Sequence, residues 1–121
     1  MLINLSNHPS VSWSAKQRAA AEELFGEIRD LPFPAVDSTG NDMYIEQLAQ
    51  EYLNIIVHKY FSNPLPVVHI MGEMTFTFAM VKALQQRGIT CVASTTERIA
   101  TEENGVKTSE FRLTLLQRII Y

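Results

Sequence analysis

Short apolar segments alternate with longer amphipathic segments along this chain, and no other feature limits its possible folds as strongly. Residues 2–5, 67–71 and 89–93 are largely apolar and suited to β-strands, and the more polar residues 27–31 are a plausible further strand. The segments between them have helical spacing. The order β-α-β-α-β-α-β predicts an α/β fold, a single Rossmann-like domain with a mostly parallel sheet and helices on both faces. We expect one domain over residues 1–121, since this length suits a single core.

Local capping patterns predict where the helices begin and end. Ser14 with Gln17 three residues later forms a capping box, with Ser12 as a competing cap, and Gly26 is expected to end this helix. Asp42 is predicted to cap the second helix. The apolar face of the first helix is expected to carry Ala20, Ala21, Leu24, Phe25 and Ile28.

The last part of the chain is predicted to be a C-terminal β-hairpin. Asn104-Gly105 is typical of a two-residue hairpin turn, and residues 106–121 are expected to return as a strand. Strand alternation places Phe111, Leu113 and Leu115 on one face.

Composition excludes several classes of protein. The chain has 10 Lys and Arg against 13 Asp and Glu, which argues against a duplex nucleic acid partner. A single cysteine, Cys91, allows no intrachain disulfide, and no apolar run reaches the ~18 residues of a membrane span. The first residues lack the pattern of a signal peptide. We therefore expect a cytoplasmic protein without a membrane partner.

No familiar cofactor or metal motif occurs in the sequence. Neither G-x-G-x-x-G nor a phosphate-binding loop is present, and no His, Cys or carboxylate spacing is typical of a metal site. We therefore expect no cofactor and no metal. His69, in the middle of an apolar strand, is interpreted as a core residue with satisfied hydrogen bonds.

Three polar segments follow predicted strands, and in a doubly wound sheet such segments meet beyond the carboxyl ends of the strands. If the strand order is 2-1-3-4, the favoured ligand site lies between strands one and three. The candidate ligand-binding residues are Ser6, Asn7, Ser10, Gly72, Glu73, Met74, Thr75, Ser94, Thr95 and Thr96. The candidate catalytic residues are His8, a general acid or base near neutral pH, and Arg98, the only cation near the third segment.

Each segment also has a purely structural interpretation. In this interpretation, the ring of His8 only caps backbone groups of the turn. Gly72 is then required by a tight strand-to-helix turn and needs no ligand. Glu73 can cap the following helix or make a dimer contact. Residues 94–96 can belong to a strand, with Glu97 and Arg98 as a solvated pair.

The chain resembles the small single-domain CRISPR-associated proteins of CARF-like type (CRISPR-associated Rossmann fold), some of which are ring nucleases. The likeness rests on the start strand running into the turn at residues 5–10 and on the apolar strand opening into a helix at residues 67–75. The third similar feature is the terminal strand pair around residues 94–96 and 111–113.

This resemblance implies a homodimer that binds cyclic oligoadenylate in a groove across its two-fold axis and cleaves the ring slowly without metal. It also implies that the ligand's own 2′-hydroxyl attacks the adjacent phosphorus. The first turn (Ser6, Asn7, His8) and the third (Gly72, Glu73, Met74, Thr75) would line the ring. No lysine lies in the three segments, and Glu73 and Glu97 stand where phosphates are expected.

The second hypothesis is a non-catalytic module of the same fold, which senses a small ligand or docks on another protein. Its basis is the apolar end of the chain, Arg118-Ile119-Ile120-Tyr121, because exposed apolar area of this kind usually marks an interface. A weaker alternative is an enzyme that acts on a nucleotide or a sugar phosphate in the same crevice.

Overall fold

The computed structural model describes residues 1–60 and 62–119, without the side chains of residues 97–99 and 108–117. The predicted α/β class is confirmed. The elements are β1 (Leu2–Ser6), the short 3-10 helix η1 (Ser10–Ser12), α1 (Ala15–Phe25), β2 (Ile28–Pro32), α2 (Asp42–Lys59), β3 (Val67–Met71), α3 (Met74–Gln86), β4 (Cys91–Glu103) and β5 (Val106–Arg118).

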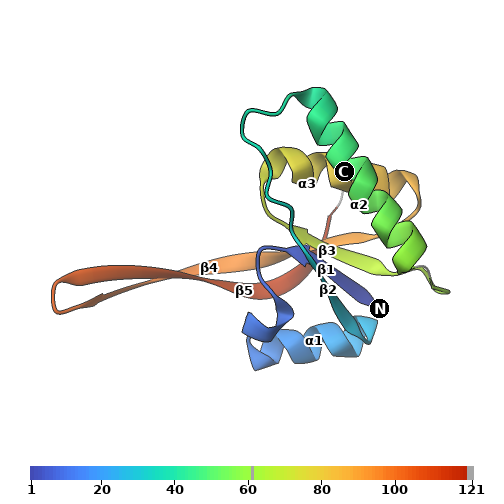
Figure 1. The fold of residues 1–121 in the computed structure, drawn as a ribbon. Helices are drawn as coiled ribbons and strands as arrows, with labels where there is room; N and C mark the ends of the chain where they lie inside the picture. Colours follow the sequence, from blue (N-terminus) through green and yellow to red (C-terminus); the bar gives the residue numbers. More distant parts are fainter. Residues whose placement is uncertain (61, 120–121) are drawn as a thin grey trace.

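The strands form one sheet in the order β2-β1-β3-β4-β5. The first four are parallel, and β5 runs antiparallel to β4. The order 2-1-3-4 assumed from the sequence is therefore confirmed, with the switch point between β1 and β3. Helix α1 covers one face of the sheet, and α2 and α3 cover the other (Figure 1). Pro32 belongs to β2 at the sheet edge, where a missing N–H leaves no ladder position unpaired.

The two faces of the sheet differ in chemistry. Ile3, Leu5, Val68 and Ile70 are buried together in an apolar core with residues of α2 and α3. The alternate side chains of the same strands point to the opposite face, which is the face that α1 covers. There, Leu2, Val92 and Ala21 pack with Trp13, but Asn4, Ser6, His69, Ser94 and Gln17 are also buried.

Helix caps agree with the sequence patterns in two places and differ in a third. The Ser14 Oγ accepts from the Gln17 N–H at 3.1 Å, and Gly26 ends α1 at φ 81°. Only this half of the predicted capping box forms, because the Gln17 side chain turns to the sheet and its Nε2 donates to Ser94 Oγ at 2.9 Å. The cap of α2 is Asn41, which accepts from the Tyr44 N–H at 2.9 Å, and not Asp42 as predicted. Asp42 is instead the first helical residue, where its charge favours the positive end of the helix dipole.

The predicted apolar face of α1 is partly wrong. Leu24 is 67% exposed and Ala20 is also exposed, whereas Gln17 and Ala21 face the sheet. The sheet surface beneath the first turn of α1 is polar, so a glutamine at that position gains a hydrogen bond that a leucine could not make.

The polar segment expected at residues 94–98 is not a turn. It lies inside β4, which continues to Glu103 because β5 pairs with it along its whole length. The threonines suit this strand, as the structural interpretation of the segment held. The predicted hairpin turn is confirmed, with Asn104 at φ 53° and Gly105 at φ 78°.

The β4–β5 hairpin projects well beyond the layers of the sheet and helices (Figure 1). Its register shifts between Thr95 and Thr96, where one extra residue stands on β5. We call the part beyond this shift, residues 96–113, the hairpin arm. Phe111, Leu113 and Leu115 were predicted to share one face, but their side chains lie outside the described residues. Ile120 and Tyr121, from the predicted apolar end of the chain, also lie outside them. Among the described residues, no helix has the length and apolar character needed to cross a membrane.

Candidate ligand-binding rim and the polar layer beneath it

The three sequence segments meet at one end of the sheet. Ser6 pairs with Met71 in the β1–β3 register, and the Asn7 N–H donates to the Met71 carbonyl at 3.3 Å. The Ser94 N–H approaches the Met71 Sδ at 3.3 Å, which places this part of β4 beside the same strand end. We call residues 7–10, 72–75 and 94–96 the carboxyl rim. Its position at the switch point is where ligands bind in open α/β sheets.

A chain of buried hydrogen bonds lies directly beneath the rim. Gln17 Nε2 on α1 donates to Ser94 Oγ at 2.9 Å, and Ser94 Oγ lies 2.8 Å from His69 Nε2. His69 Nδ1 lies 2.8 Å from Asn4 Oδ1. Asn4 Nδ2 donates to Asp30 Oδ1 at 2.8 Å. This series of hydrogen bonds therefore crosses the parallel strands from β4 through β3 and β1 to β2.

The partners of Asn4 fix the direction of every bond in this chain. Its Nδ2 faces two acceptors, the His8 carbonyl and Asp30, so its Oδ1 must be the atom that faces His69. His69 therefore carries its proton on Nδ1, and its Nε2 accepts the hydroxyl proton of Ser94. Each group donates to the next, from Gln17 to the carboxylate of Asp30.

His69 is held in its neutral form. Burial lowers its pKa from 6.5 to about 4, with a further contribution from the nearby His8. The edge of its ring also packs on Trp13, with ring centroids 5.1 Å apart. The prediction of a satisfied core histidine is confirmed.

Ser94, His69 and Asn4 have the connectivity of a nucleophile, a base and an orienting group. Three observations limit what they can do chemically. The orienting group is a neutral amide, and a base with a pKa of about 4 holds little of the transferred proton at neutral pH. Ser94 is also buried beneath Gln17. The arrangement therefore orders the structure below the rim and does not activate the serine.

The first turn is held by backbone contacts to this polar layer. The His8 carbonyl accepts from Asn4 Nδ2 at 2.8 Å and from Trp13 Nε1 at 2.9 Å. The His8 N–H donates to Ser6 Oγ at 3.1 Å. The backbone of His8 is therefore fixed on three sides, while its imidazole remains half-buried at the rim.

Asp30 secures the other end of the same turn. It accepts from the Ser10 N–H at 3.1 Å and from the Ser10 hydroxyl at 2.8 Å. Burial alone would raise the pKa of Asp30, but the hydrogen bonds from Asn4 and Ser10, with the positive charge of Arg18, outweigh it and lower the pKa. The carboxylate is therefore charged at neutral pH and stabilises the turn.

Glu73 caps α3, as one of its sequence interpretations held. Its carboxylate accepts from the N–H groups of Thr75 at 3.1 Å and Phe76 at 2.8 Å, and from the Thr75 hydroxyl at 2.7 Å. These bonds, that from Phe76 above all, lower the pKa of Glu73. The negative charge at the rim thus serves the helix N-terminus.

The space beside Gly72 is filled by protein. A Cβ at this position would overlap the ring of Phe33, which packs edge-on against Phe76 with centroids 5.2 Å apart. The structure therefore supports the tight-turn interpretation of Gly72, and Phe33 occupies the space where a ligand could otherwise approach this glycine.

The predicted site residues with side chains fall into three groups. Ser6, Ser10 and Ser94 are buried and hydrogen-bonded within the fold. Arg98 stands opposite Phe111 in the hairpin arm, and its side chain lies outside the described residues. The side chains that remain at the rim, fully or partly exposed, are Asn7, His8, Glu73, Met74, Thr75, Thr95 and Thr96.

Sequence reasoning missed Asn4 and Asp30 as members of the polar layer, and it gave Gln17 only a capping role. A signal for the first was present, because polar residues alternate with apolar ones in β1 as Leu2, Asn4 and Ser6. In a strand buried on both faces, such alternation indicates a polar contact on one face. The partners across the sheet were not readable, since they depend on register.

One cavity of about 530 Å³ touches the rim on the side of α2 and α3. Its lining includes Glu73 and Thr75 together with Asp37, Asp42 and Glu46, and no lysine or arginine side chain that the structure describes lines it. Phosphate groups would be repelled there. No cluster of three or more metal-ligating side chains occurs among the described residues.

The family comparison covers nearly the whole chain. A family model described as "Uncharacterized protein MJ1673 family" matches residues 1–114. The chain belongs to the MJ1673 family. The description of the family contains no link to CRISPR systems or to CARF proteins, so the expected relationship is supported only at the level of a Rossmann-like fold. No curated protein and no solved structure matches the chain.

Proposed function

We propose that the carboxyl rim binds a cyclic oligoadenylate, with two copies of the chain arranged around a two-fold axis. The observation that carries this proposal is the convergence of three polar segments at the switch point between β1 and β3. Ligands of open α/β sheets bind at such points because strand ends there leave a crevice open to solvent.

The chemistry of the rim supports a nucleotide ligand. Asn7, Thr95 and Thr96 present exposed amide and hydroxyl groups, which can contact base edges and ribose. His8 presents an imidazole on a turn whose backbone is fixed. A site held in advance loses less conformational entropy when it binds a ligand.

The reaction we propose at this rim is opening of the ring without metal. The ligand's 2′-oxygen forms a bond to the adjacent phosphorus, and the bond from phosphorus to the 5′-oxygen breaks. His8 accepts the proton of the 2′-hydroxyl and can return it to the leaving 5′-oxygen. Arg98 offsets the negative charge that develops on the phosphate. The product is a linear oligoadenylate with a 2′,3′-cyclic phosphate end.

The test uses the purified full chain with cyclic tetra-adenylate and cyclic hexa-adenylate. Binding is measured by calorimetry, and ring opening is followed by chromatography. We expect His8→Ala to retain binding and to lose turnover by about 100-fold or more, the usual contribution of a general base. His58→Ala, on the exposed surface of α2, is the matched control. Absence of both binding and thermal stabilisation with either ring would refute the proposal.

A second candidate function is a protein-interaction module. Met74 and Phe78 lie one turn apart on α3 and are 65% and 66% exposed, and Val11 near the first turn is 82% exposed. Large apolar side chains that remain exposed outside the core favour contact with another chain. Sedimentation of the protein by itself distinguishes the two functions, because the nucleotide site we propose needs a homodimer and a docking module does not.

A further inference from the structure

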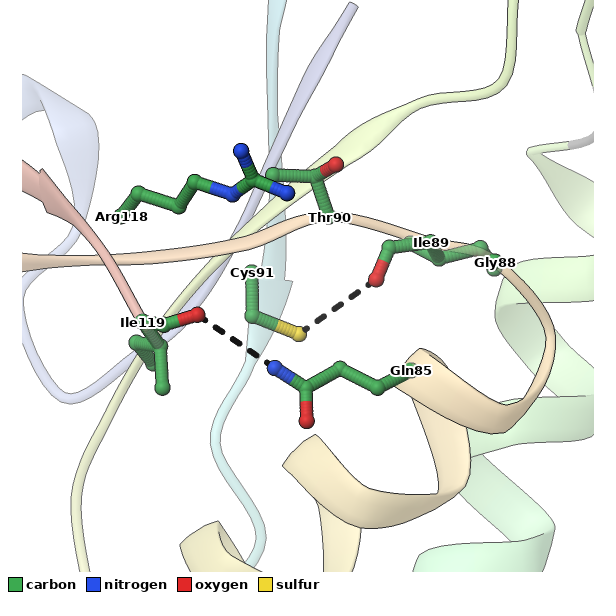
Figure 2. A pocket seen from close by; sticks show the side chains of 7 residues that line it. All are labelled: Gln85, Gly88, Ile89, Thr90, Cys91, Arg118 and Ile119. Carbon is green, nitrogen blue, oxygen red and sulfur yellow. Dashed lines mark hydrogen bonds between the residues drawn. The ribbon is translucent and has the colours of Figure 1, made fainter. Parts of the chain in front are cut away.

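A second cavity, of about 570 Å³, lies at the end of the sheet opposite the carboxyl rim. It opens where α3 ends, β4 begins and β5 finishes. Figure 2 shows the seven residues that line it, which are Gln85, Gly88, Ile89, Thr90, Cys91, Arg118 and Ile119. Its volume falls within the range of small-molecule sites.

The polar side chains of this cavity suit an anion. The guanidinium of Arg118 points toward Thr90, which adds a hydroxyl (Figure 2). Gln85 adds an amide whose Nε2 makes only a long 3.4 Å bond to the Ile119 carbonyl. Among the described side chains of residues 1–60 and 62–119, no carboxylate lines the cavity.

The guanidinium has no competing counter-ion in the part of the chain that the structure describes. The two ion pairs among these residues join Arg18 to Glu22 and Arg29 to Glu27. The helix C-terminus beside the cavity is also largely neutralised. Its carbonyls at Leu84 and Gln85 already accept backbone N–H groups of the turn that follows.

The remaining walls are apolar. Ile89 and Cys91 are buried, and Ile119 is partly buried. Burial raises the pKa of the Cys91 thiol to about 12, so the sulfur is neutral at physiological pH. A ligand that fits this cavity therefore combines one negative group with a hydrocarbon part.

We propose that this cavity binds a small carboxylate with an apolar substituent. The two carboxylate oxygens engage the planar fork of Arg118, with Thr90 as a further donor. The hydrocarbon part lies against Ile89, Cys91 and Ile119. The bound ligand would join β4, β5 and α3 at the base of the hairpin.

The test measures binding to the full chain by NMR, with hexanoate as the probe and isoleucine methyl groups as reporters. We expect hexanoate to shift the methyl resonances of Ile89 and Ile119 in a saturable manner. 1-Hexanol, which has the same carbon chain length and no charge, should bind about tenfold more weakly, because it lacks the charge-assisted bonds.

Arg118→Gln should weaken hexanoate binding by about tenfold, whereas Arg118→Lys, which keeps the charge, should weaken it less. Arg29→Gln, on the opposite edge strand, is the matched control and should bind as the unaltered protein does. Thr90→Val provides a second variant, with a smaller loss expected, should Arg118→Gln fail to fold. The proposal is overturned if hexanoate leaves the methyl resonances of Ile89 and Ile119 unshifted, or if inorganic phosphate binds and hexanoate does not. It is also overturned if the Arg118→Gln and Thr90→Val variants bind hexanoate as tightly as the unaltered protein does.

Discussion

At the scale of single residues, His69 shows how burial decides the role of a titratable group. Its ring nitrogens serve Asn4 and Ser94, and neither partner carries a charge that would favour the imidazolium. Burial therefore dominates, and the pKa falls to about 4. The residue contributes to stability only while it stays neutral.

This pKa predicts how stability changes with pH. The unfolded chain binds a proton at His69 near pH 6.5 and the folded chain only near pH 4, so lowering the pH across this window favours unfolding. The free energy of unfolding should fall by about 3 kcal/mol between pH 7 and pH 4 through this residue. Urea titrations at several pH values measure this change in the free energy of unfolding. His69→Asn should show a flatter profile, and an unchanged slope would contradict the prediction.

Asp30 gives a second prediction for a single residue, in which the charged form is the carboxylate anion and not the imidazolium cation. Its lowered pKa means that its stabilising contribution is present above about pH 3.8 and is lost as the pH falls further. Asp30→Asn places an amide among the donors of Asn4 and Ser10, and should cost about 1 kcal/mol at neutral pH, since solvent reaches the site. Glu23→Gln on the exposed surface of α1 is the control. Equal urea midpoints for the two variants would contradict the expectation.

At the scale of elements, the close approach of Phe33 to Gly72 joins the loop after β2 to the start of α3. The ring of Phe33 occupies the place of the missing Cβ and packs on Phe76, which also contacts Tyr52 of α2. This contact fills the space beside Gly72 with side chains, and the cavity that touches the rim on the α2–α3 side is lined by carboxylates that repel phosphate. We therefore expect a phosphate-bearing ligand of the rim to lie on the other side, toward the first turn and β4.

Gly72→Ala tests this packing. The added Cβ would overlap the ring of Phe33, and we expect a loss of about 1–3 kcal/mol from overpacking. Phe33→Leu in the same chain should recover part of the loss, so the two substitutions should be non-additive in a double-mutant cycle. Additive effects on the thermal midpoint would show that the two residues are not coupled.

The hairpin arm is the second example at this scale, and we expect the layered body to fold without it. Figure 1 shows it away from the layered body, and its backbone is paired only between β4 and β5. A two-stranded hairpin gains little stability by itself. The arm therefore stabilises the body little and is available for a partner.

Shortening the arm distinguishes a role in stabilising the body from a role in contacting a partner. Replacing residues 98–111 by Asn-Gly joins Glu97 to its register partner Arg112. We expect the body to stay folded, with a thermal midpoint close to that of the full chain, and the proposed homodimer to be lost in sedimentation. Loss of folding, or an unchanged dimer, would show that the arm has another role.

At the scale of the whole molecule, the two ends of the sheet offer different chemistry. The carboxyl rim presents amide, hydroxyl and imidazole groups above a polar layer, and we propose a nucleotide ligand there. The opposite end presents Arg118 above apolar walls, and we propose a small carboxylate there. β4 touches both sites, since it begins at one end of the sheet and passes the rim at Ser94.

Local sequence patterns were sufficient to predict the elements, their order and the hairpin turn. Apolar periods, the Ser14 cap and Asn104-Gly105 depend on neighbouring residues alone. Which polar groups meet became visible only in the folded sheet. Asn4 reaches His69 across 65 residues of sequence, and Gln17 reaches Ser94 across 77. Such pairs depend on strand register and on the side of the sheet that each crossover takes, and both are set when the sheet closes around its core.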